Sequence, residues 1–302
     1  MTALLAIESN RLDETVIVDE SILKSYGSGI YIQVGEELTL RDLLYGLMLR
    51  SGNDAAMMIS SFISGSEEDF VVMMNKKASE IGMNNTVFNN SCGLDNDKGN
   101  YSSAYDMALL TSYAMKYDEY KKIVSTKEYR LKTNYKTYLW KNKNKLLEID
   151  YITGGKTGFT ERAKRTLVST ASKDNMNMVI VTLNDGDDWN RHRLLYEEAF
   201  TIYKSYKVLD KNNYLVDDSY YNNNLYIKND VYLTLKEGEI DELKNEIEIE
   251  KLSKFKDGEV VGNNAIYLGD ILLLRENIYI SKNNAIKDIS IWQKIWKWIK
   301  FW

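Results

Sequence analysis

The chain has 302 residues and a formal net charge of −5, from 39 lysine and arginine residues against 44 aspartate and glutamate residues. Hydrophobic residues make up 44% of the sequence, which supports a sizeable core and argues against wholesale disorder, and the length allows one large domain or two of ordinary size. The acidic balance argues against a general nucleic-acid-binding protein, the single Cys92 excludes a disulfide framework and a cysteine-built zinc site, and the single His192 disfavours a Ser-His-Asp triad.

An apolar run opens the sequence at residues 1–7, and no capping residue stands before it. Because helices ordinarily begin at a Ser, Thr, Asp or Asn cap, the pattern indicates a helix whose start lies upstream, and we expect a preceding segment to be missing. The run has neither a basic leader nor a cleavage site, so it is not predicted to be a signal peptide.

Residues 1 to about 205 mix helical and strand patterns, which predicts an α/β domain. Thr39 is placed to cap one helix, and Gly82 stands where a C-cap glycine would end the next. That second helix is expected to bury a face made of Phe70, Met73, Met74 and Ala78. The spacing predicts helices over 38–49, 66–81, 103–116 and 189–206. It also predicts strands at 167–171 and 178–183, which form a hairpin around 173–175. The helix over 189–206 is expected to pack on the sheet that these strands form.

From about residue 207 the pattern changes to short alternating runs separated by polar turns. These runs lie at 225–227, 231–235, 247–249, 265–268 and 271–274. Alternation with a period of two residues predicts a small all-β domain.

The end of the sequence has a third pattern, in which Asp288 is placed to cap a helix over 289–302. Four tryptophans and four isoleucines share one broad face of that helix, while Lys294, Lys297 and Lys300 lie opposite. Tryptophan and apolar residues on one face with lysine on the other are typical of a helix lying in a membrane interface. A helix docked on the protein's own core or on a partner is the alternative.

Two short polar strings stand out in the first 205 residues. Ser51-Gly52-Asn53 follows directly on the helix that ends at Arg50, and Lys156-Thr157-Gly158 precedes the strand pair. A lone Ser-x-Asn occurs by chance in most chains, whereas Lys-Thr-Gly is rarer. In this order, about 105 residues apart, the two match the second and third motifs of penicillin-recognising serine enzymes.

Further stretches around the two motifs continue the match. They are residues 29–56, Phe70-Val71, Met74-Asn75, Gly82-Met83, Asn85-Thr86, Gly93-Leu94, Tyr105-Asp106-Met107-Ala108 and Gly154-Gly155-Lys156-Thr157-Gly158-Phe159-Thr160. With these stretches, residues 1 to about 205 resemble the serine-type D-Ala-D-Ala carboxypeptidases, the low-molecular-mass penicillin-binding proteins. A small β domain and an amphipathic C-terminal anchor are also typical of that family.

The resemblance implies an α+β fold, with a penicillin-binding/β-lactamase-like transpeptidase domain at 1–205, a small all-β domain at 206–286 and a membrane-anchoring amphipathic helix at 287–302. It implies hydrolysis of the terminal D-alanine of peptidoglycan stem peptides through an acyl-serine intermediate, without a metal or organic cofactor. The implied partners are the stem peptide, β-lactam antibiotics and a membrane surface, but no nucleic acid. The implied location is the extracytoplasmic face of the bacterial cell membrane, with the signal peptide lost together with the missing N-terminus.

The main departure from the family is the absence of its first motif, Ser-x-x-Lys, which supplies the acylated serine and the lysine that activates it. Relatives carry this motif directly before a string similar to residues 1–8, so we expect the 302-residue chain to be inactive. Ser21-Ile22-Leu23-Lys24 has the right letters but stands in the wrong place relative to Ser51. Cys92 stands where relatives commonly have histidine, and it is expected to be a small loop residue and not a nucleophile.

The resemblance assigns catalytic roles to Ser51, Asn53 and Lys156. Acyl transfer needs a nucleophile, a base, a proton donor for the leaving amine and donors for the oxyanion. A hydroxyl such as Ser51 can relay a proton if it lies between a lysine and the leaving nitrogen. Asn53 can donate and accept at once, and Lys156 supplies a positive charge beside the site. The hydroxyl of Ser51 and the ammonium of Lys156 are therefore predicted to face each other across one cleft, beside the helix that opens the chain.

Substrate binding is assigned to Lys156, Thr157, Gly158, Phe159 and Arg191. Thr157 offers a hydroxyl to the terminal carboxylate, Gly158 lets the substrate approach the strand edge, and the backbone N–H of Phe159 is one oxyanion donor by resemblance. Arg191, or its neighbour Arg193, is the candidate for a further cation that binds the carboxylate, with a solvated arginine on a helix face as the alternative. His192 is expected at the surface or behind the site, and Asp185, Asp187 and Asp188 are expected to form a solvated turn.

Two other interpretations remain open. Loss of the nucleophile motif favours a non-catalytic module that binds peptidoglycan and membrane, whereas retention of both other motifs disfavours it. A relative of the class A β-lactamases would account for the motifs but for neither the β domain nor the tryptophan-rich tail.

Overall fold

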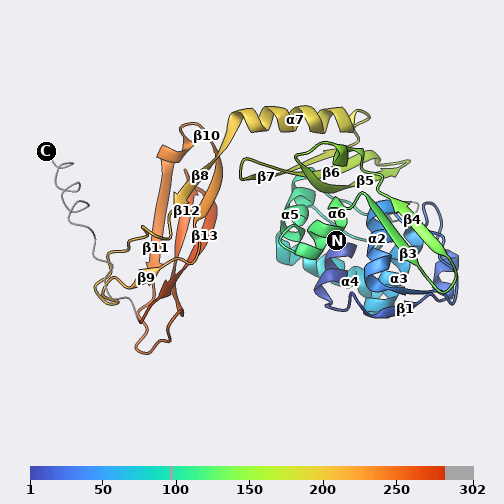
Figure 1. Ribbon diagram of the computed structural model, residues 1–302, viewed down its shortest axis with the longest axis horizontal. Coiled ribbons are helices and arrows are strands. Elements are labelled where there is room, and N and C mark those ends of the chain that lie inside the picture. Colours follow the sequence, from blue (N-terminus) through green and yellow to red (C-terminus); the bar gives the residue numbers. More distant parts are fainter. Residues whose placement is uncertain (96–97, 283–302) are drawn as a thin grey trace. The chain divides into compact units, whose positions relative to one another are not determined.

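The computed structural model of the chain describes residues 1–95 and 98–282, so the helix predicted at 287–302 lies outside the described residues. The chain divides into two compact units, Met1–Phe200 and Thr201–Trp302 (Figure 1). Each unit has its own hydrophobic core. No helix within the described ranges is both long and apolar enough to cross a membrane.

The first 125 residues of the first unit are mainly helical. They form α1 (Thr2–Glu8), β1 (Thr15–Ile17), the 3-10 helix η1 (Glu20–Lys24), β2 (Glu37–Thr39), α2 (Leu40–Arg50), α3 (Asn53–Ser64), α4 (Glu67–Ile81), α5 (Ala104–Ala114) and α6 (Asp118–Ser125). The apolar run at the start of the sequence lies inside the core, because α1 buries every residue from Thr2 to Ile7.

The capping signals in the sequence set the ends of these helices. Thr39 and Asp42 form a reciprocal capping box at the start of α2, in which the Thr39 hydroxyl accepts from the Asp42 N–H at 3.1 Å and the Asp42 carboxylate accepts from the Thr39 N–H at 2.8 Å. Gly82 ends α4 in the left-handed conformation, with φ at 88°. These predictions are confirmed, but Met73 is 37% exposed while the other three residues of the predicted face are buried.

A three-stranded antiparallel sheet follows, in the order β5–β6–β7. Its strands are β5 (Ile152–Thr160), β6 (Lys164–Lys173) and β7 (Met176–Leu183), and before them come the hairpin β3 (Glu128–Lys132) and β4 (Thr137–Lys141) and the 3-10 helix η2 (Lys145–Glu148). Asp174 and Asn175 form the tight turn of the predicted β6–β7 hairpin, with φ at 51° and 62°. The structure therefore confirms the hairpin and gives it a shorter turn.

Glycine at position 155 lets β5 lie close to β6. A Cβ added to Gly155 would stand 2.2 Å from the carbonyl oxygen of Val168, and its φ of 144° is one that other residues rarely adopt. Because the obstacle is backbone and cannot turn away, any side chain here would push the two strands apart. The glycine directly before Lys156 thus allows β5 and β6 to pair closely at the point of the sheet where that lysine lies.

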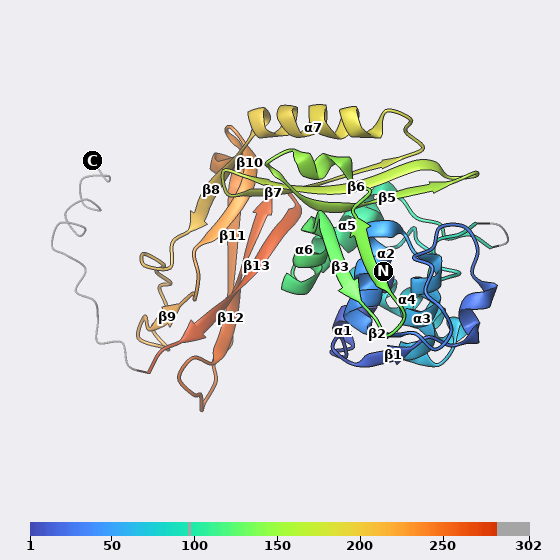
Figure 2. The same cartoon turned by 45° about the vertical axis from the view of Figure 1, so that its right-hand side comes forward.

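Helices cover both faces of this sheet. The helix α7 (Asp188–Ile202) lies on one face, and α5 and α6 lie on the other with the rest of the helices (Figures 1 and 2). Tyr196 of α7 packs on Leu167 and Ala171 of β6. The prediction that this helix continues to Tyr206 is wrong, because Tyr203 begins strand β8 (Tyr203–Leu209), which pairs with β10 (Val231–Lys236).

The second unit is a small all-β domain, as predicted. Besides the β8–β10 pair it contains a four-stranded sheet in the order β11–β12–β13–β9, made of β9 (Leu225–Tyr226), β11 (Leu243–Ile249), β12 (Val260–Leu268) and β13 (Ile271–Ile280), and a 3-10 helix, η3 (Glu239–Glu242). Alternation along β13 brings Ile278 and Ile280 into its core, and neither residue is more than 1% exposed.

Candidate active site

Ser51 lies at a sharp turn between two helices. It ends α2 in the left-handed conformation, with φ at 61° and ψ at 46°, which costs a non-glycine residue free energy. Gly52 then begins α3, and a Cβ there would come within 3.0 Å of both the Asp54 carboxylate and Ile30. The strained turn places the Ser51 hydroxyl beyond the end of α2, beside strand β5.

Lys156 of β5 meets this hydroxyl. Its Nζ donates to the Ser51 Oγ at 2.5 Å and to the Thr157 carbonyl at 2.7 Å. The predicted pairing of the two motifs is therefore confirmed at atomic distance. Burial and, to a smaller extent, the positive charge of Lys143 together lower the pKa of Lys156 to about 7. At neutral pH the amine is thus only partly protonated, and it can exchange a proton with the hydroxyl that it contacts.

Asn53 is buried at the start of α3, with 7% of its surface exposed. Its side-chain amide donates to the Tyr26 carbonyl at 2.7 Å, and its backbone N–H donates to the Ser28 carbonyl at 2.8 Å. The Asp54 carboxylate accepts from the backbone N–H groups of Ile30 and Tyr31 and so holds the same loop. Residues 26–31 therefore fix the orientation of the Asn53 amide.

A cavity of about 360 Å³ adjoins Asn53. Lys24 lines this cavity, whereas the Ser21 hydroxyl contacts the Met58 sulfur of α3 at 3.5 Å. Cys92 also lines the cavity, and burial raises the pKa of its thiol, which keeps it protonated. The side chains of Ser21 and Lys24 thus lie in different surroundings, and Cys92 lacks the thiolate character of a nucleophile.

All four residues of the Lys-Thr-Gly-Phe string lie in β5, at the edge of the sheet. A Cβ on Gly158 would come within 2.4 Å of the Thr166 hydroxyl, so a side chain here would require that hydroxyl to move. Thr157 is partly buried, and the Phe159 side chain is 63% exposed. An edge strand offers backbone donors and acceptors to an extended peptide, so β5 can bind a substrate as an added strand.

Arg191 and Arg193 lie away from Ser51 and Lys156. Both lie on α7, where the Arg191 guanidinium binds the Asp185 carboxylate, and Arg193 binds Glu197 at 2.9 Å. That helix packs on the sheet face opposite the helical layer to which Ser51 belongs (Figures 1 and 2). The structure therefore does not bring Arg191 next to Ser51 and Lys156, and its role in binding the substrate carboxylate stays a prediction.

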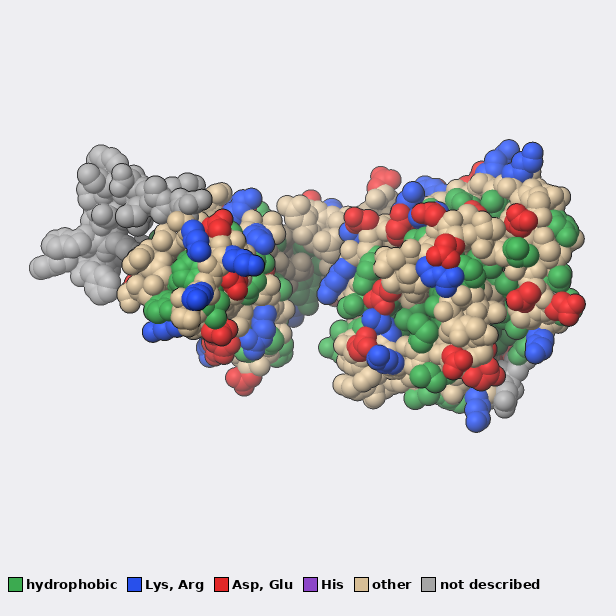
Figure 3. Space-filling model, turned by 90° about the horizontal axis from the view of Figure 1, so that it is seen from below, with side chains coloured by type: hydrophobic (Ala, Val, Ile, Leu, Met, Phe, Trp, Pro, Cys, Tyr) green, Lys and Arg blue, Asp and Glu red, His purple; other side chains and the backbone are tan. Residues whose placement is uncertain are grey.

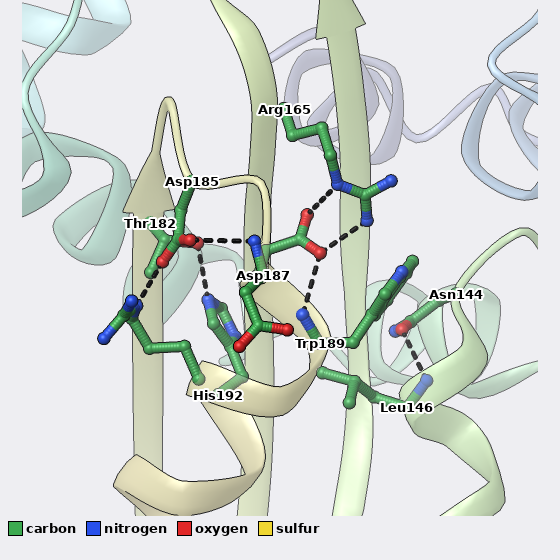
Figure 4. Close-up of polar contacts among 10 residues, drawn as sticks. Asn144, Leu146, Arg165, Thr182, Asp185, Asp187, Trp189 and His192 are labelled. Carbon is green, nitrogen blue, oxygen red and sulfur yellow. Dashed lines mark hydrogen bonds and ion pairs between the residues drawn. The ribbon is translucent and has the colours of Figure 1, made fainter.

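His192 and Asp188 both belong to α7 and are buried, and Figure 4 shows His192 among the polar residues of this region. His192 is fully buried between the hydroxyls of Ser169, at 2.7 Å, and Thr182, at 3.0 Å, and burial lowers its pKa to about 4. Asp188 is 2% exposed and binds the Arg165 guanidinium at 2.5 and 3.2 Å. The expectation of a solvated turn is therefore wrong for Asp188, and these groups attach α7 to the sheet. Within residues 1–95 and 98–282 no cluster of His, Cys, Asp or Glu has the make-up of a metal site.

Lys143 is the neighbour of the site that the sequence did not reveal. It follows β4, and its backbone N–H donates to the Leu49 carbonyl at 3.2 Å, two residues before Ser51. The string Asn142-Lys143-Asn144 signals a turn in the sequence, but nothing local connects that turn with Ser51.

Comparison with known proteins agrees with this geometry. Residues 1–187 match the D-alanyl-D-alanine carboxypeptidase family, and residues 203–292 match the C-terminal domain of penicillin-binding protein 5. The D-alanyl-D-alanine carboxypeptidase DacF of Bacillus subtilis is 36% identical over 222 residues, which are 70% of this chain and 57% of DacF. DacA of Haemophilus influenzae is 28% identical over 291 residues, which are 90% of this chain and 71% of DacA.

Comparison with solved structures points to the same family. Penicillin binding protein 5 from Haemophilus influenzae superposes with a TM-score of 0.69 at 25% identity, over 93% of this chain and 88% of that one. The D-alanyl-D-alanine carboxypeptidase from Mycobacterium tuberculosis superposes with a TM-score of 0.62 at 27% identity, over 67% of this chain and 80% of that one. The chain therefore belongs to the D-alanyl-D-alanine carboxypeptidase family and has the fold of the low-molecular-mass penicillin-binding proteins.

Proposed function

We propose that this protein is a serine-type D-Ala-D-Ala carboxypeptidase that hydrolyses the terminal D-alanine of peptidoglycan stem peptides, with the Ser-x-x-Lys nucleophile motif absent from the 302-residue chain. The observation that carries the proposal is the 2.5 Å contact between Lys156 Nζ and Ser51 Oγ, together with the lowered pKa of that lysine. A lysine that is half protonated near neutral pH suits a group that must both accept and release a proton.

The roles of the site residues follow from their positions. Ser51 and Lys156 pass a proton to the nitrogen of the departing D-alanine, and the buried Asn53 holds the peptide amide. Strand β5 binds the peptide backbone at its open edge, with the Phe159 N–H as an oxyanion donor and the Thr157 hydroxyl at the terminal carboxylate. The acylated serine of this family comes from the Ser-x-x-Lys motif, and none of the residues placed at the site here takes that role.

A non-catalytic remnant that binds peptidoglycan and membrane is the alternative, and the missing motif favours it. We further propose the division into a catalytic domain at 1–205, a β domain at 206–286 and an anchoring helix at 287–302, on the extracytoplasmic face of the bacterial membrane. β-Lactam antibiotics, which resemble the substrate of this family, are proposed to bind the same site.

Incubation with a labelled penicillin distinguishes the two functions. The 302-residue chain should form no covalent adduct, whereas the protein extended by the codons upstream of Met1 should form one and should release D-alanine from a stem peptide. An extended protein that carries Ser-x-x-Lys and is not labelled would contradict the carboxypeptidase. If the 302-residue chain itself is labelled, loss of the label in Ser21→Ala would show that the nucleophile lies in the string 21–24.

A further inference from the structure

Strand β5 is attached to its surroundings at two points on one face. Side chains along a strand alternate between its two faces, so Lys156, Gly158 and Thr160 share one face. On this face Lys156 contacts the Ser51 hydroxyl, and four residues further on the Thr160 hydroxyl donates to the Asp95 carboxylate. Four residues of strand span about 13 Å. The two contacts therefore enclose the part of the edge strand that is expected to bind the peptide.

A second contact of Thr160 settles the direction of its hydrogen bond to Asp95. The Thr160 hydroxyl accepts from the Ala163 backbone N–H at 3.0 Å, which leaves its single proton for the Asp95 carboxylate. The Arg162 guanidinium donates to the Asp95 backbone carbonyl at 3.1 Å. Asp95 therefore holds both the last residue of β5 and the turn that follows it.

The loop that carries Asp95 is itself fixed by side chains of two helices. The Glu67 carboxylate of α4 accepts from the Ser91 backbone N–H at 2.6 Å and from the Ser91 hydroxyl at 2.9 Å. The Thr2 hydroxyl of α1 donates to the Ser91 carbonyl at 2.7 Å, and Ser91 is 6% exposed. Because the backbone four residues before Asp95 is buried and bonded on both sides, the loop is a firm support for the Asp95 carboxylate.

Phe159 lies directly before Thr160, and its backbone N–H points to the open edge of the sheet. Phe159 is opposite Arg165 of β6, and the Arg165 carbonyl accepts from the Asp185 N–H at 3.1 Å, on the side of β7. In an antiparallel ladder, two opposite residues either bond to each other or both point away. Phe159 therefore directs its N–H and C=O away from β6, and this N–H lies one residue from the contact with Asp95.

Asp95 is placed differently from an ordinary surface carboxylate. On the face drawn in Figure 3, acidic and basic side chains are interspersed at the surface, where water screens their charges. Asp95 is half-buried, and its carboxylate contacts a hydroxyl of the strand that carries the Lys-Thr-Gly motif. A hydrogen bond to a charged group that is partly removed from water is stronger and restricts geometry more. The contact is therefore suited to hold the end of β5.

We propose that Asp95 is a positioning residue for the carboxypeptidase reaction, which holds the end of β5 through the Thr160 hydroxyl so that the Phe159 N–H faces the substrate carbonyl. The inference rests on the proposed function, which gives this N–H to the oxyanion. The contact matters because β5 pairs with β6 alone and leads into a turn, residues 161–163, that is exposed. A small displacement of this end weakens a donor that must lie about 3 Å from the oxyanion.

Binding of a peptide to the 302-residue chain tests the proposal without turnover. Calorimetry below the unfolding temperature of every variant would use diacetyl-Lys-D-Ala-D-Ala. Thr160→Val and Asp95→Ala should each lower the affinity about fivefold, the loss expected for one weakened hydrogen bond, and the double variant should lose no more than either single variant. Thr160→Ser should bind as tightly as the wild type. Glu161→Gln, which removes an exposed carboxylate from the adjacent turn, should do the same.

NMR of ¹⁵N-labelled phenylalanine amides separates positioning from a purely structural role. The Phe159 amide signal, assigned with Phe159→Leu, should shift on peptide binding in the wild type and in Thr160→Ser, and should shift less in Thr160→Val. If the wild type binds the peptide and Thr160→Val and Asp95→Ala bind it equally well, the inference is wrong while the proposed function stands, even where the variants unfold at lower temperature. Additive losses in the double variant would also overturn the inference. If the wild type does not bind the peptide, the proposed function fails and the inference fails with it.

Discussion

Replacing Lys156 with methionine should change how the stability of the first unit depends on pH. Burial lowers the pKa of this lysine from 10.5 to about 7, so folding is less favourable whenever the side chain is protonated. Below pH 7 both the folded and the unfolded chain carry the proton, and the full cost applies. Between pH 7 and 10.5 the unfolded chain binds a proton that the folded chain has released, so the free energy of unfolding rises with pH.

The size of this effect follows from the shift in pKa. One proton over one pH unit is worth about 1.4 kcal/mol, so the contribution of Lys156 to the free energy of unfolding should rise by about 2 kcal/mol between pH 7 and 9. Methionine keeps the length of the side chain and removes the charge, so Lys156→Met should lack this rise. The hydrogen bonds to Ser51 and Thr157 are lost at every pH, which shifts the curve without changing its slope.

Urea unfolding followed by the circular dichroism of the α-helices would measure this difference in the free energy of unfolding. The helical signal reports on the first unit, because among the described residues the α-helices precede the strands of the second unit. The free energy of unfolding of the wild type minus that of Lys156→Met should increase from about pH 6 to about pH 9. Lys145→Met, which removes an exposed lysine, should give a flat difference. A flat difference for Lys156→Met as well would refute the lowered pKa, and with it the proton-transfer role of Lys156.

Three other predictions concern separate parts of the chain. Ser51→Gly and Ser51→Ala both remove the hydroxyl, but thermal unfolding should find the glycine variant more stable by about 1 kcal/mol, because only alanine pays the steric cost of the left-handed conformation; equal stabilities would argue against strain at this turn. Asp188→Ala should lower the free energy of unfolding by about 2 kcal/mol, because it removes a buried carboxylate that pairs with the half-exposed Arg165, whereas Asp187→Ala, at an exposed position, should change it little; similar values for the two would contradict that account. The full chain should sediment with anionic lipid vesicles and a chain ending at residue 286 should not; equal sedimentation would place membrane binding outside 287–302.

Local signals in the sequence were sufficient for much of the fold. The cap at Thr39 and the glycine at 82 act within one helical turn, so they could be predicted without tertiary information. The end of α7 was misplaced, because the residues from Tyr203 form a strand only by pairing with β10, far along the chain. Helix α3 and the β3–β4 hairpin were not predicted, although both are regular elements.

The candidate site was predictable only where a motif could be recognised. Ser51 and Lys156 lie 105 residues apart, and their contact was expected from the resemblance to a known family and not from any local pattern. The carboxylate-binding cation was assigned to Arg191 because this residue follows the strand ending at Leu183, near the place where relatives have such a group. Its pairing with Asp185 and the approach of Lys143 to α2 both depend on tertiary packing, which the sequence does not display.

The effect of substitutions on stability can distinguish the site from the scaffold that supports it. At the site the fold holds unfavourable features, namely a left-handed serine, a partly buried lysine with a lowered pKa, and neighbouring like charges. Beneath α7 the polar groups are buried with their partners, as in the Asp188–Arg165 pair and the hydroxyls around His192. A substitution that removes an unfavourable feature of the site should stabilise the protein and weaken peptide binding. A substitution that removes a paired buried group under α7 should only destabilise the protein. If Ser51→Gly and Lys156→Met destabilise the chain at low pH as much as Asp188→Ala does, the residues around Ser51 are ordinary scaffold, and the case for a strained catalytic centre fails.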